Sequence, residues 1–312
     1  RQRQMCIRDR FLFIAGVSFP YSVAKQRAGG MSEGRIYAKI VRRGLTLVVL
    51  GMVYNGLFKL DFENLRIASV LGRIGLAWSI AAVLYLNFGV KTRAAIAVAV
   101  LAGYGALSAL VAAPDAAGAG PLTFEGNLAG YIDRQFLPGK LIYGSFDPEG
   151  LLSTVPAVVT AMLGMFTGEF VRRSDIRGGR KTLWMAAAAA ALLAAGLAFS
   201  GVLPVNKKLW SSTFVCVVGA YSLGMFALFY YLIDVRGWRR WTLFFRVVGL
   251  NSITIYLAQR IVGFGRISDF FLGGIASKCP EAVAAVISSA GYVAVCWLFL
   301  YFLYRKNVFL KV

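Results

Sequence analysis

Long apolar stretches bounded by charged or turn-forming residues recur along nearly the whole chain of 312 residues. A bilayer core of about 30 Å is crossed by a helix of roughly 20 apolar residues. Stretches near that length lie at 11–24, 44–58, 67–88, 94–113, 149–171, 182–203, 209–233, 241–262 and 282–304. Such stretches must be helical, because lipid offers no hydrogen-bond partners to an open backbone. The pattern predicts an all-α, polytopic integral membrane helical bundle with about nine transmembrane helices.

The composition excludes several classes of protein. Hydrophobic residues make up 58% of the chain and charged residues 15%, against about 45–50% and about 25% in soluble domains. The chain contains no histidine, which excludes a Ser/His/Asp or Cys/His nucleophile and a histidine-ligated metal within it. The four cysteines show no C-x-x-C spacing. We therefore predict no metal site.

The net charge of +20 would usually suggest binding to nucleic acid, but its distribution indicates membrane topology. The loops after the first, third, fifth and seventh spans, and the C-terminal tail, are rich in Lys and Arg, whereas the other loops are balanced. Cytoplasmic loops carry such an excess. We predict a multi-pass protein of the bacterial inner membrane with a cytoplasmic C-terminus, the lipid bilayer as a partner and no nucleic-acid partner.

The first ten residues, RQRQMCIRDR, form a charged stretch that runs abruptly into the first apolar segment. They are typical of a translated sequencing adapter, so we interpret 1–10 as a foreign segment and 11–312 as a single transmembrane domain. Nine spans that end in the cytoplasm would begin outside. We therefore expect an N-terminally truncated chain with one further span upstream.

Two acidic residues, Asp147 and Glu149, lie where the longest outer loop meets the fifth span. One reading is structural: Asp147 caps the helix, Pro148 occupies its first turn, and Glu149 complements the helix dipole. The other reading is catalytic. The sequence leaves both open.

Polar residues within and beside the spans are further candidates. Arg73 lies about two turns below the predicted outer surface, at a cost of at least roughly 2.5–3.5 kcal/mol, so we expect a bundle-facing partner or a ligand. Asn251 and Ser252 fall in the middle of the eighth span and suit either inter-helical hydrogen bonds or substrate contact. In the outer loop 203–212, Lys207 is expected to snorkel and Trp210 to join the interfacial aromatic belt.

Several segments together resemble the heparan-α-glucosaminide N-acetyltransferase-like membrane acyltransferases, some of whose bacterial relatives are labelled N-acetylglucosamine-related transporters. The segments are FLFIAGVSFP, RIASVLGRIGLAW, NLAGYIDR, FDPEGLLSTVPAVVTAMLGMFTGEF, PVNKKLWSSTFVCVVGAYSL and FFRVVGLNSITIYLAQR. They run in order from Phe11 to about Arg260.

The resemblance implies transfer of an acetyl group from cytoplasmic acetyl-CoA to a sugar amine or hydroxyl on the outer face. It assigns supporting catalytic roles to Arg73, Asp147 and Glu149. It assigns acceptor binding to Asn206, Lys207, Trp210, Asn251 and Ser252. For the phosphates of CoA, the cluster Lys39, Arg42 and Arg43 lies on the predicted cytoplasmic side and is chemically suitable. The excess of positive charge on cytoplasmic loops explains these residues equally well.

The resemblance also implies an essential histidine in an outer segment upstream of Phe11, where it would act as a base or a transient acetyl carrier. Because the chain has no histidine, we expect this polypeptide to be inactive by itself. A transporter or permease for amino sugars is the alternative function, since a polytopic bundle with an intramembrane arginine serves either role. The sequence also leaves open the formation of a homodimer.

Overall fold

The structure, a computed structural model, describes residues 2–61 and 63–310, with side chains from residue 10 onward. Its regular elements are helices, joined by loops with two isolated β-bridges, Arg66 to Gly139 and Ala112 to Asn127. The α-helices are α1 (Gln2–Ala28), α2 (Glu33–Asn55), α3 (Val70–Asn87), α4 (Val90–Leu110), α5 (Leu128–Phe136), α6 (Leu151–Arg172), α7 (Gly178–Ala198), α8 (Ser212–Tyr230), α9 (Thr242–Leu250), α10 (Ser252–Ile261), α11 (Phe264–Ala276) and α12 (Glu281–Arg305). Short turns η1 (Leu57–Lys59), η2 (Phe199–Gly201) and the π-helical η3 (Tyr231–Val235) extend α2, α7 and α8. The predicted all-α fold is confirmed for the described residues.

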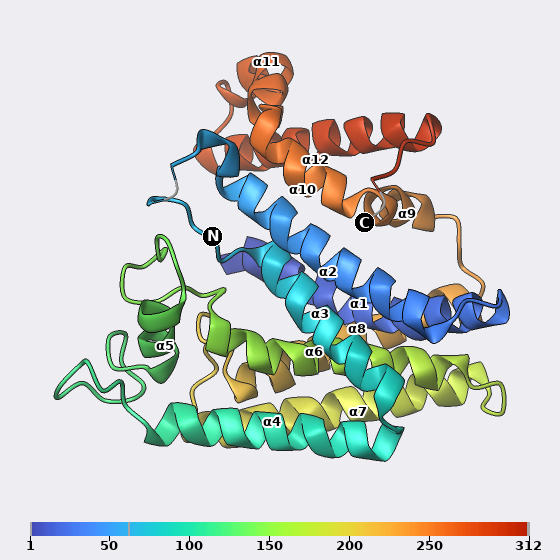
Figure 1. Cartoon of the computed structure of the whole chain (residues 1–312). Coiled ribbons are helices and arrows are strands. Elements are labelled where there is room, and N and C mark those ends of the chain that lie inside the picture. Colours follow the sequence, from blue (N-terminus) through green and yellow to red (C-terminus); the bar gives the residue numbers. More distant parts are fainter. Residues whose placement is uncertain (1, 62, 311–312) are drawn as a thin grey trace. The chain divides into compact units, whose positions relative to one another are not determined.

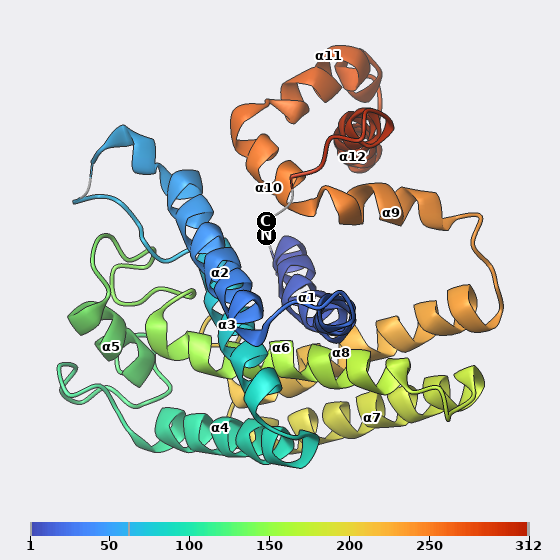
Figure 2. The same ribbon diagram turned by 45° about the vertical axis from the view of Figure 1, so that its right-hand side comes forward.

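The chain divides into two compact units, the first ending at Arg236 and the second beginning at Gly237. In the first unit, α1 packs along α6, α2 along α3, and α7 along α8, while α3 and α4 also contact α6 (Figures 1 and 2). Helix α6 is the most buried of the long apolar helices, whereas α4 and α7 face outward. The first unit is therefore a bundle built around α6.

Successive long helices of the first unit reverse direction, so the loops gather at two opposite ends (Figure 1). One end holds α5 and the loops 56–69, 111–127, 137–150 and 202–211; we call it the α5 end. The other holds the short loops 29–32, 88–89 and 173–177; we call it the Arg93 end. The sequence predicts that the α5 end faces outward and the Arg93 end faces the cytoplasm.

Within the described part of the chain, six helices are long and apolar enough to cross a membrane. They lie at Val70–Asn87, Val90–Leu110, Leu151–Arg172, Gly178–Gly201, Ser212–Val235 and Glu281–Arg305. The eighth predicted span, 241–262, is instead two helices of 9 and 10 residues that meet at Asn251. At about 1.5 Å per residue, neither crosses a bilayer core of about 30 Å alone.

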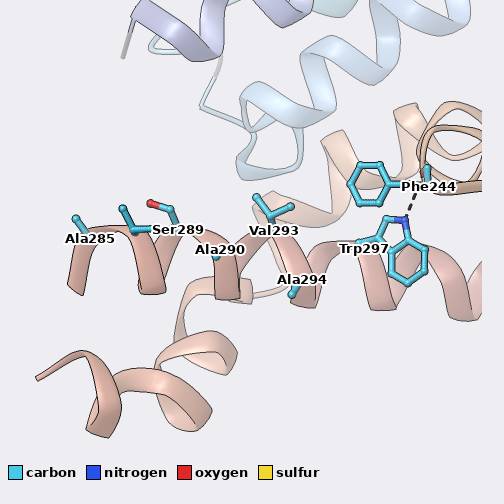
Figure 3. A pocket seen from close by; sticks show the side chains of 8 residues that line it. Phe244, Ala285, Ser289, Ala290, Val293, Ala294 and Trp297 are labelled. Carbon is cyan, nitrogen blue, oxygen red and sulfur yellow. Dashed lines mark hydrogen bonds between the residues drawn. The ribbon is translucent and has the colours of Figure 1, made fainter. Parts of the chain in front are cut away.

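In the second unit, α11 packs along α12, and α9 contacts both α10 and α12. Helix α11 lies between the last two apolar stretches that the sequence predicts as spans, 241–262 and 282–304. A groove of about 780 Å³ follows one face of α12. Figure 3 shows small side chains such as Ala285 and Ala290 along it and Trp297 donating a hydrogen bond to the Phe244 carbonyl at 3.4 Å. Apart from Ser289, its lining is apolar or aromatic, so the groove offers surface for packing rather than chemistry.

Candidate functional site

A buried polar centre lies at the α5 end, where α3, α5 and α6 begin. Two of these helices begin at capping residues, which orient them there: Ser69 accepts from the Gly72 N–H at the start of α3, and Asn127 accepts from the Gly130 N–H at the start of α5. Each cap satisfies one backbone donor at the helix N-terminus. The loop 137–150 then runs from α5 to α6, with Gly139 paired to Arg66 in a β-bridge.

Arg66 holds both acidic residues that the sequence singles out. Its Nε donates to Asp147 Oδ2 at 2.6 Å and its Nη2 to Asp147 Oδ1 at 2.5 Å, a bidentate pair, and Nη2 also donates to Glu149. Burial by itself would lower the pKa of Arg66, but the hydrogen bonds to Asp147 and the charges of Glu149 and Asp147 raise it overall. Bidentate charge-assisted pairs of this kind fix geometry strongly.

The two carboxylates differ in access. The Asp147 side chain is fully buried, and it also accepts hydrogen bonds from the backbone N–H groups of Ile142 and Glu149. The Glu149 side chain is 17% exposed. Glu149 is thus the more accessible carboxylate of this pair, while Asp147 orders the turn beneath it.

Asp133 on α5 is a third buried carboxyl, and the sequence does not single it out. Its Oδ2 accepts from the Asp147 N–H at 3.2 Å and its Oδ1 from the Leu151 N–H at 2.9 Å. Burial raises the pKa of Asp133 to about 6, against the lowering effect of these two hydrogen bonds. Asp133 therefore ties α5 to the turn that carries Asp147 and to the start of α6.

The structural reading of Asp147 and Pro148 is wrong. Helix α6 begins at Leu151, and its N-cap is Gly150, without a side-chain cap. The N–H of Leu151 binds Asp133, which is 18 residues upstream. Pro148 precedes the N-cap and contributes its carbonyl oxygen to Arg73. A carboxyl from another helix thus replaces the local cap, which sequence spacing could not reveal.

Arg73 faces the bundle and is 5% exposed. Its Nη2 donates to the Pro148 carbonyl and to Ser153 Oγ, the latter at 2.5 Å. The guanidinium carbon also lies 4.7 Å from the centroid of the Trp210 ring. A guanidinium over an aromatic face is stabilised by a cation–π interaction. The partners expected for Arg73 are therefore protein groups of α6 and of the loop 202–211.

The interfacial position predicted for Trp210 is wrong. Its side chain is buried in the main core of the first unit beside Phe214, and its Nε1 lies 3.4 Å from Thr160 Oγ1. The ammonium group of Lys207 lies 5.9 Å from the Phe214 ring. The loop thus folds inward because Arg73 provides a buried cationic partner for the indole.

Asn206 acts within the same loop. Its Oδ1 accepts from the Lys208 N–H at 2.9 Å, and its backbone N–H donates to Ser211 Oγ at 2.9 Å. The Lys208 ammonium group lies over the Tyr143 ring at 4.6 Å. Asn206 therefore shapes the turn that places Trp210 under Arg73.

Asn251 and Ser252 lie in the second unit. Asn251 is 1% exposed and joins α9 to α10; its Oδ1 accepts from Thr254 Oγ1 at 3.3 Å. Its buried Nδ2 has no hydrogen-bond partner among the described residues. Ser252 is the first residue of α10. The middle of the predicted eighth span is thus a helix break, which sequence periodicity missed.

The cluster proposed for CoA lies on the first half of α2, toward the Arg93 end. Lys39 and Arg42 are exposed, while Arg43 lies 4.5 Å over the Trp78 ring, and its buried Nε has no hydrogen-bond partner in the described part of the chain. Two exposed cations and one orphaned donor fit a phosphate-bearing ligand. No group of three His, Cys, Asp or Glu suited to a metal occurs within the described ranges.

These features define a class: a multi-pass helical membrane protein with a buried Arg–carboxylate centre at one end of its bundle. No family model matches the chain. The chain is similar over 97% of its length to heparan-alpha-glucosaminide N-acetyltransferase of Homo sapiens, at 27% identity, and to that of Mus musculus, at 25%. It spans about half of these relatives, 53% and 54% of their lengths. The resemblance to this group of membrane acetyltransferases is thereby confirmed.

Proposed function

We propose that the chain forms part of a membrane acetyltransferase that takes an acetyl group from acetyl-CoA at the Arg93 end and delivers it to a sugar amine or hydroxyl at the α5 end. The observation that carries this proposal is the similarity to N-acetyltransferases over 97% of the chain. The name of the human relative specifies a glucosaminide, which favours an amino-sugar acceptor.

The geometry at the α5 end suits acceptor binding. A sugar ammonium or hydroxyl needs an accessible carboxylate, and Glu149 offers one beside the buried Asp147. Arg66 donates hydrogen bonds to both carboxylates, and their oxygens can accept further hydrogen bonds from an amine or hydroxyl. Their role in this proposal is to orient the acceptor.

Transfer itself requires a base or an acyl carrier, which the resemblance assigns to a histidine. The chain contains none. We therefore propose that this polypeptide binds both substrates but does not transfer acetyl groups by itself. An imidazole supplied in solution has the same chemistry and should restore a measurable rate, because its pKa of about 6.5 suits proton and acyl transfer at neutral pH.

The topology belongs to the same proposal. The six apolar helices would be joined in the membrane by α1, α2 and the α9–α10 pair to make about nine spans. The two units would then form one transmembrane domain of a bacterial inner membrane, with a cytoplasmic C-terminus.

The experiment is a transfer assay on the full chain in proteoliposomes, with labelled acetyl-CoA outside and glucosamine inside, in the presence and absence of imidazole. The proposal predicts saturable acetyl-CoA binding, no transfer without imidazole and transfer with it. A clear rate without imidazole would overturn the proposed inactivity. Counterflow of labelled glucosamine without any acetyl donor would replace the acetyltransferase by the transporter.

A further inference from the structure

A buried arginine with unused hydrogen-bond donors lies at the end of the bundle opposite the polar centre. Arg93 belongs to the first turn of α4 and is 4% exposed. Its Nη2 donates to Glu169 at 2.7 Å, while its Nε and Nη1 are buried without a partner among the described residues. Buried donors are normally satisfied, so an orphaned pair on one guanidinium points to a missing acceptor.

Two aromatic rings hold the guanidinium in place. Its central carbon lies 4.4 Å from the centroid of Tyr85 on α3 and 5.3 Å from that of Phe166 on α6. Tyr85 in turn packs edge-on against Phe19 of α1. The unused donors of Arg93 are thus pre-organised by three neighbouring helices, as in a preformed binding site.

The surrounding charge favours an anion. Arg27, Arg93 and Arg172 all lie within electrostatic range of the Tyr85 hydroxyl, as does the carboxylate of Glu169; Arg27 is itself paired with Glu33. Helix α4 begins at the same place. Its N-cap is Gly89, which has no side chain to cap the helix, and its first turn contains no acidic residue. A helix N-terminus with that composition attracts negative charge.

Glu169 marks the route of access. Its side chain is 36% exposed, whereas that of Arg93 is 5% exposed. Its carboxylate occupies one edge of the guanidinium, and an oxyanion arriving from the exposed side of Glu169 could displace it. A phosphate group accepts two parallel hydrogen bonds from one edge of a guanidinium, so it can take one orphaned donor together with the Nη2 that now binds Glu169.

We propose that Arg93, flanked by Tyr85 and Phe166 and gated by Glu169, binds a phosphate group of a ligand at the end of the bundle that is predicted to be cytoplasmic. Naming CoA as the bearer of that phosphate rests on the proposed function. The phosphate of an anionic lipid headgroup has the same chemistry. The experiment separates these two sources.

The test uses the full chain in phosphatidylcholine nanodiscs, with CoA binding measured by equilibrium dialysis. Arg93→Gln should weaken CoA binding about tenfold or more, the effect of losing charge-assisted hydrogen bonds. Arg93→Lys should retain part of the affinity, since it keeps the charge but not the fork geometry. Glu169→Gln should tighten binding, because it removes the competing carboxylate; a misfolded variant would not bind more tightly.

The matched control is Arg180→Gln, which removes one positive charge from an exposed position next to the 173–177 loop and should leave CoA binding unchanged. A second arm uses nanodiscs that contain phosphatidylglycerol and measures the lipid retained by each variant. Loss of lipid retention in Arg93→Gln, with CoA binding unaffected, would assign the site to a headgroup and leave the proposed function to another CoA site. Failure of the wild type to bind CoA would overturn the proposed function, while the lipid arm still decides on the phosphate site. If Arg93→Gln matches the wild type in both CoA binding and lipid retention, the proposed phosphate site at Arg93 is overturned.

Discussion

Arg66 connects two parts of the chain that are 81 residues apart in sequence, through its pair with Asp147. The Asp147 side chain is fully buried, and Arg66 is the cation paired with it. Removal of one member of a buried ion pair leaves an uncompensated charge and typically costs about 3–5 kcal/mol. The pair with Arg66 is therefore the electrostatic support of the polar centre at the α5 end.

We expect Arg66→Gln to lower the free energy of unfolding by about 3 kcal/mol, measured by denaturant unfolding in detergent micelles. The control is Arg173→Gln, which breaks an exposed pair with Asp175 and should change stability little, because solvent screens such pairs. Equal losses in the two variants would contradict a special role for the buried pair.

Asp133 should make stability depend on pH. Its pKa in the folded protein is raised to about 6 by burial, above the value of about 3.9 in an unfolded chain. Such a group contributes stability that is present below its unfolded pKa and lost as the pH rises through its folded pKa. Between about pH 4 and pH 7 the wild type should therefore lose stability relative to Asp133→Asn, which has no charge to acquire.

The measurement is the unfolding free energy of both proteins at several pH values, taken as a difference at each pH. Groups other than Asp133 titrate in both proteins and largely cancel. A difference that stays constant from pH 4 to pH 7 would show that Asp133 does not titrate in this range.

At the scale of helices, glycines allow the backbones of α1 and α6 to approach closely. A Cβ at Gly164 would overlap the Phe13 carbonyl oxygen, and one at Gly168 would overlap that of Val17. Small residues allow the close backbone approach that holds helices together in lipid. This contact carries α1 along the most buried helix of the bundle.

We expect Gly164→Ala to destabilise the fold by about 1–3 kcal/mol, the usual effect of overpacking, in thermal unfolding of the detergent-solubilised chain. Gly179→Ala is the matched control, because Gly179 lies in α7 with open space around it. It should be neutral or slightly stabilising, since alanine favours a helix more than glycine. A destabilised control, or an unaffected Gly164 variant, would contradict close packing of α1 and α6.

The helices were largely predictable from sequence, but the contacts of the site were not. Apolar runs of about 20 residues predict the long helices α3, α4, α6, α7, α8 and α12 because lipid imposes that length. Helix α5 has only 9 residues within a polar loop, so length gives no signal for it. Its Asp133 binds a turn 14 residues away, and neither periodicity nor capping rules describe such a pairing.

For Arg73, the sequence predicts a buried position but not the partners found there. Its depth in an apolar segment predicts a buried partner, and the structure places it among Pro148, Ser153 and Trp210. The identity of those partners depends on where the loop 202–211 folds. The sequence does not predict that Trp210 folds inward, because an aromatic residue near the end of a span more often lies at the membrane–water interface. The sequence does not indicate that Arg66 pairs with Asp147 and Glu149, because a charged residue in an outer loop is common.

In the first unit as a whole, the two ends carry different chemistry. The α5 end holds the carboxylates Asp133, Asp147 and Glu149, and the Arg93 end holds Arg93, whose Nε and Nη1 are buried without a partner among the described residues. An acetyltransferase that works across a membrane needs such a division, with an anionic donor on one side and an amine or hydroxyl acceptor on the other.

The most direct test of this division is binding of labelled acetyl-CoA to sealed bacterial membrane vesicles that contain the full chain, in inside-out and right-side-out preparations. The positive-inside rule places the Arg93 end on the outer surface of inside-out vesicles. We expect saturable binding of acetyl-CoA to inside-out vesicles. Right-side-out vesicles should bind no more acetyl-CoA than vesicles that lack the chain. Saturable binding confined to right-side-out vesicles, or binding to neither preparation, would contradict this division.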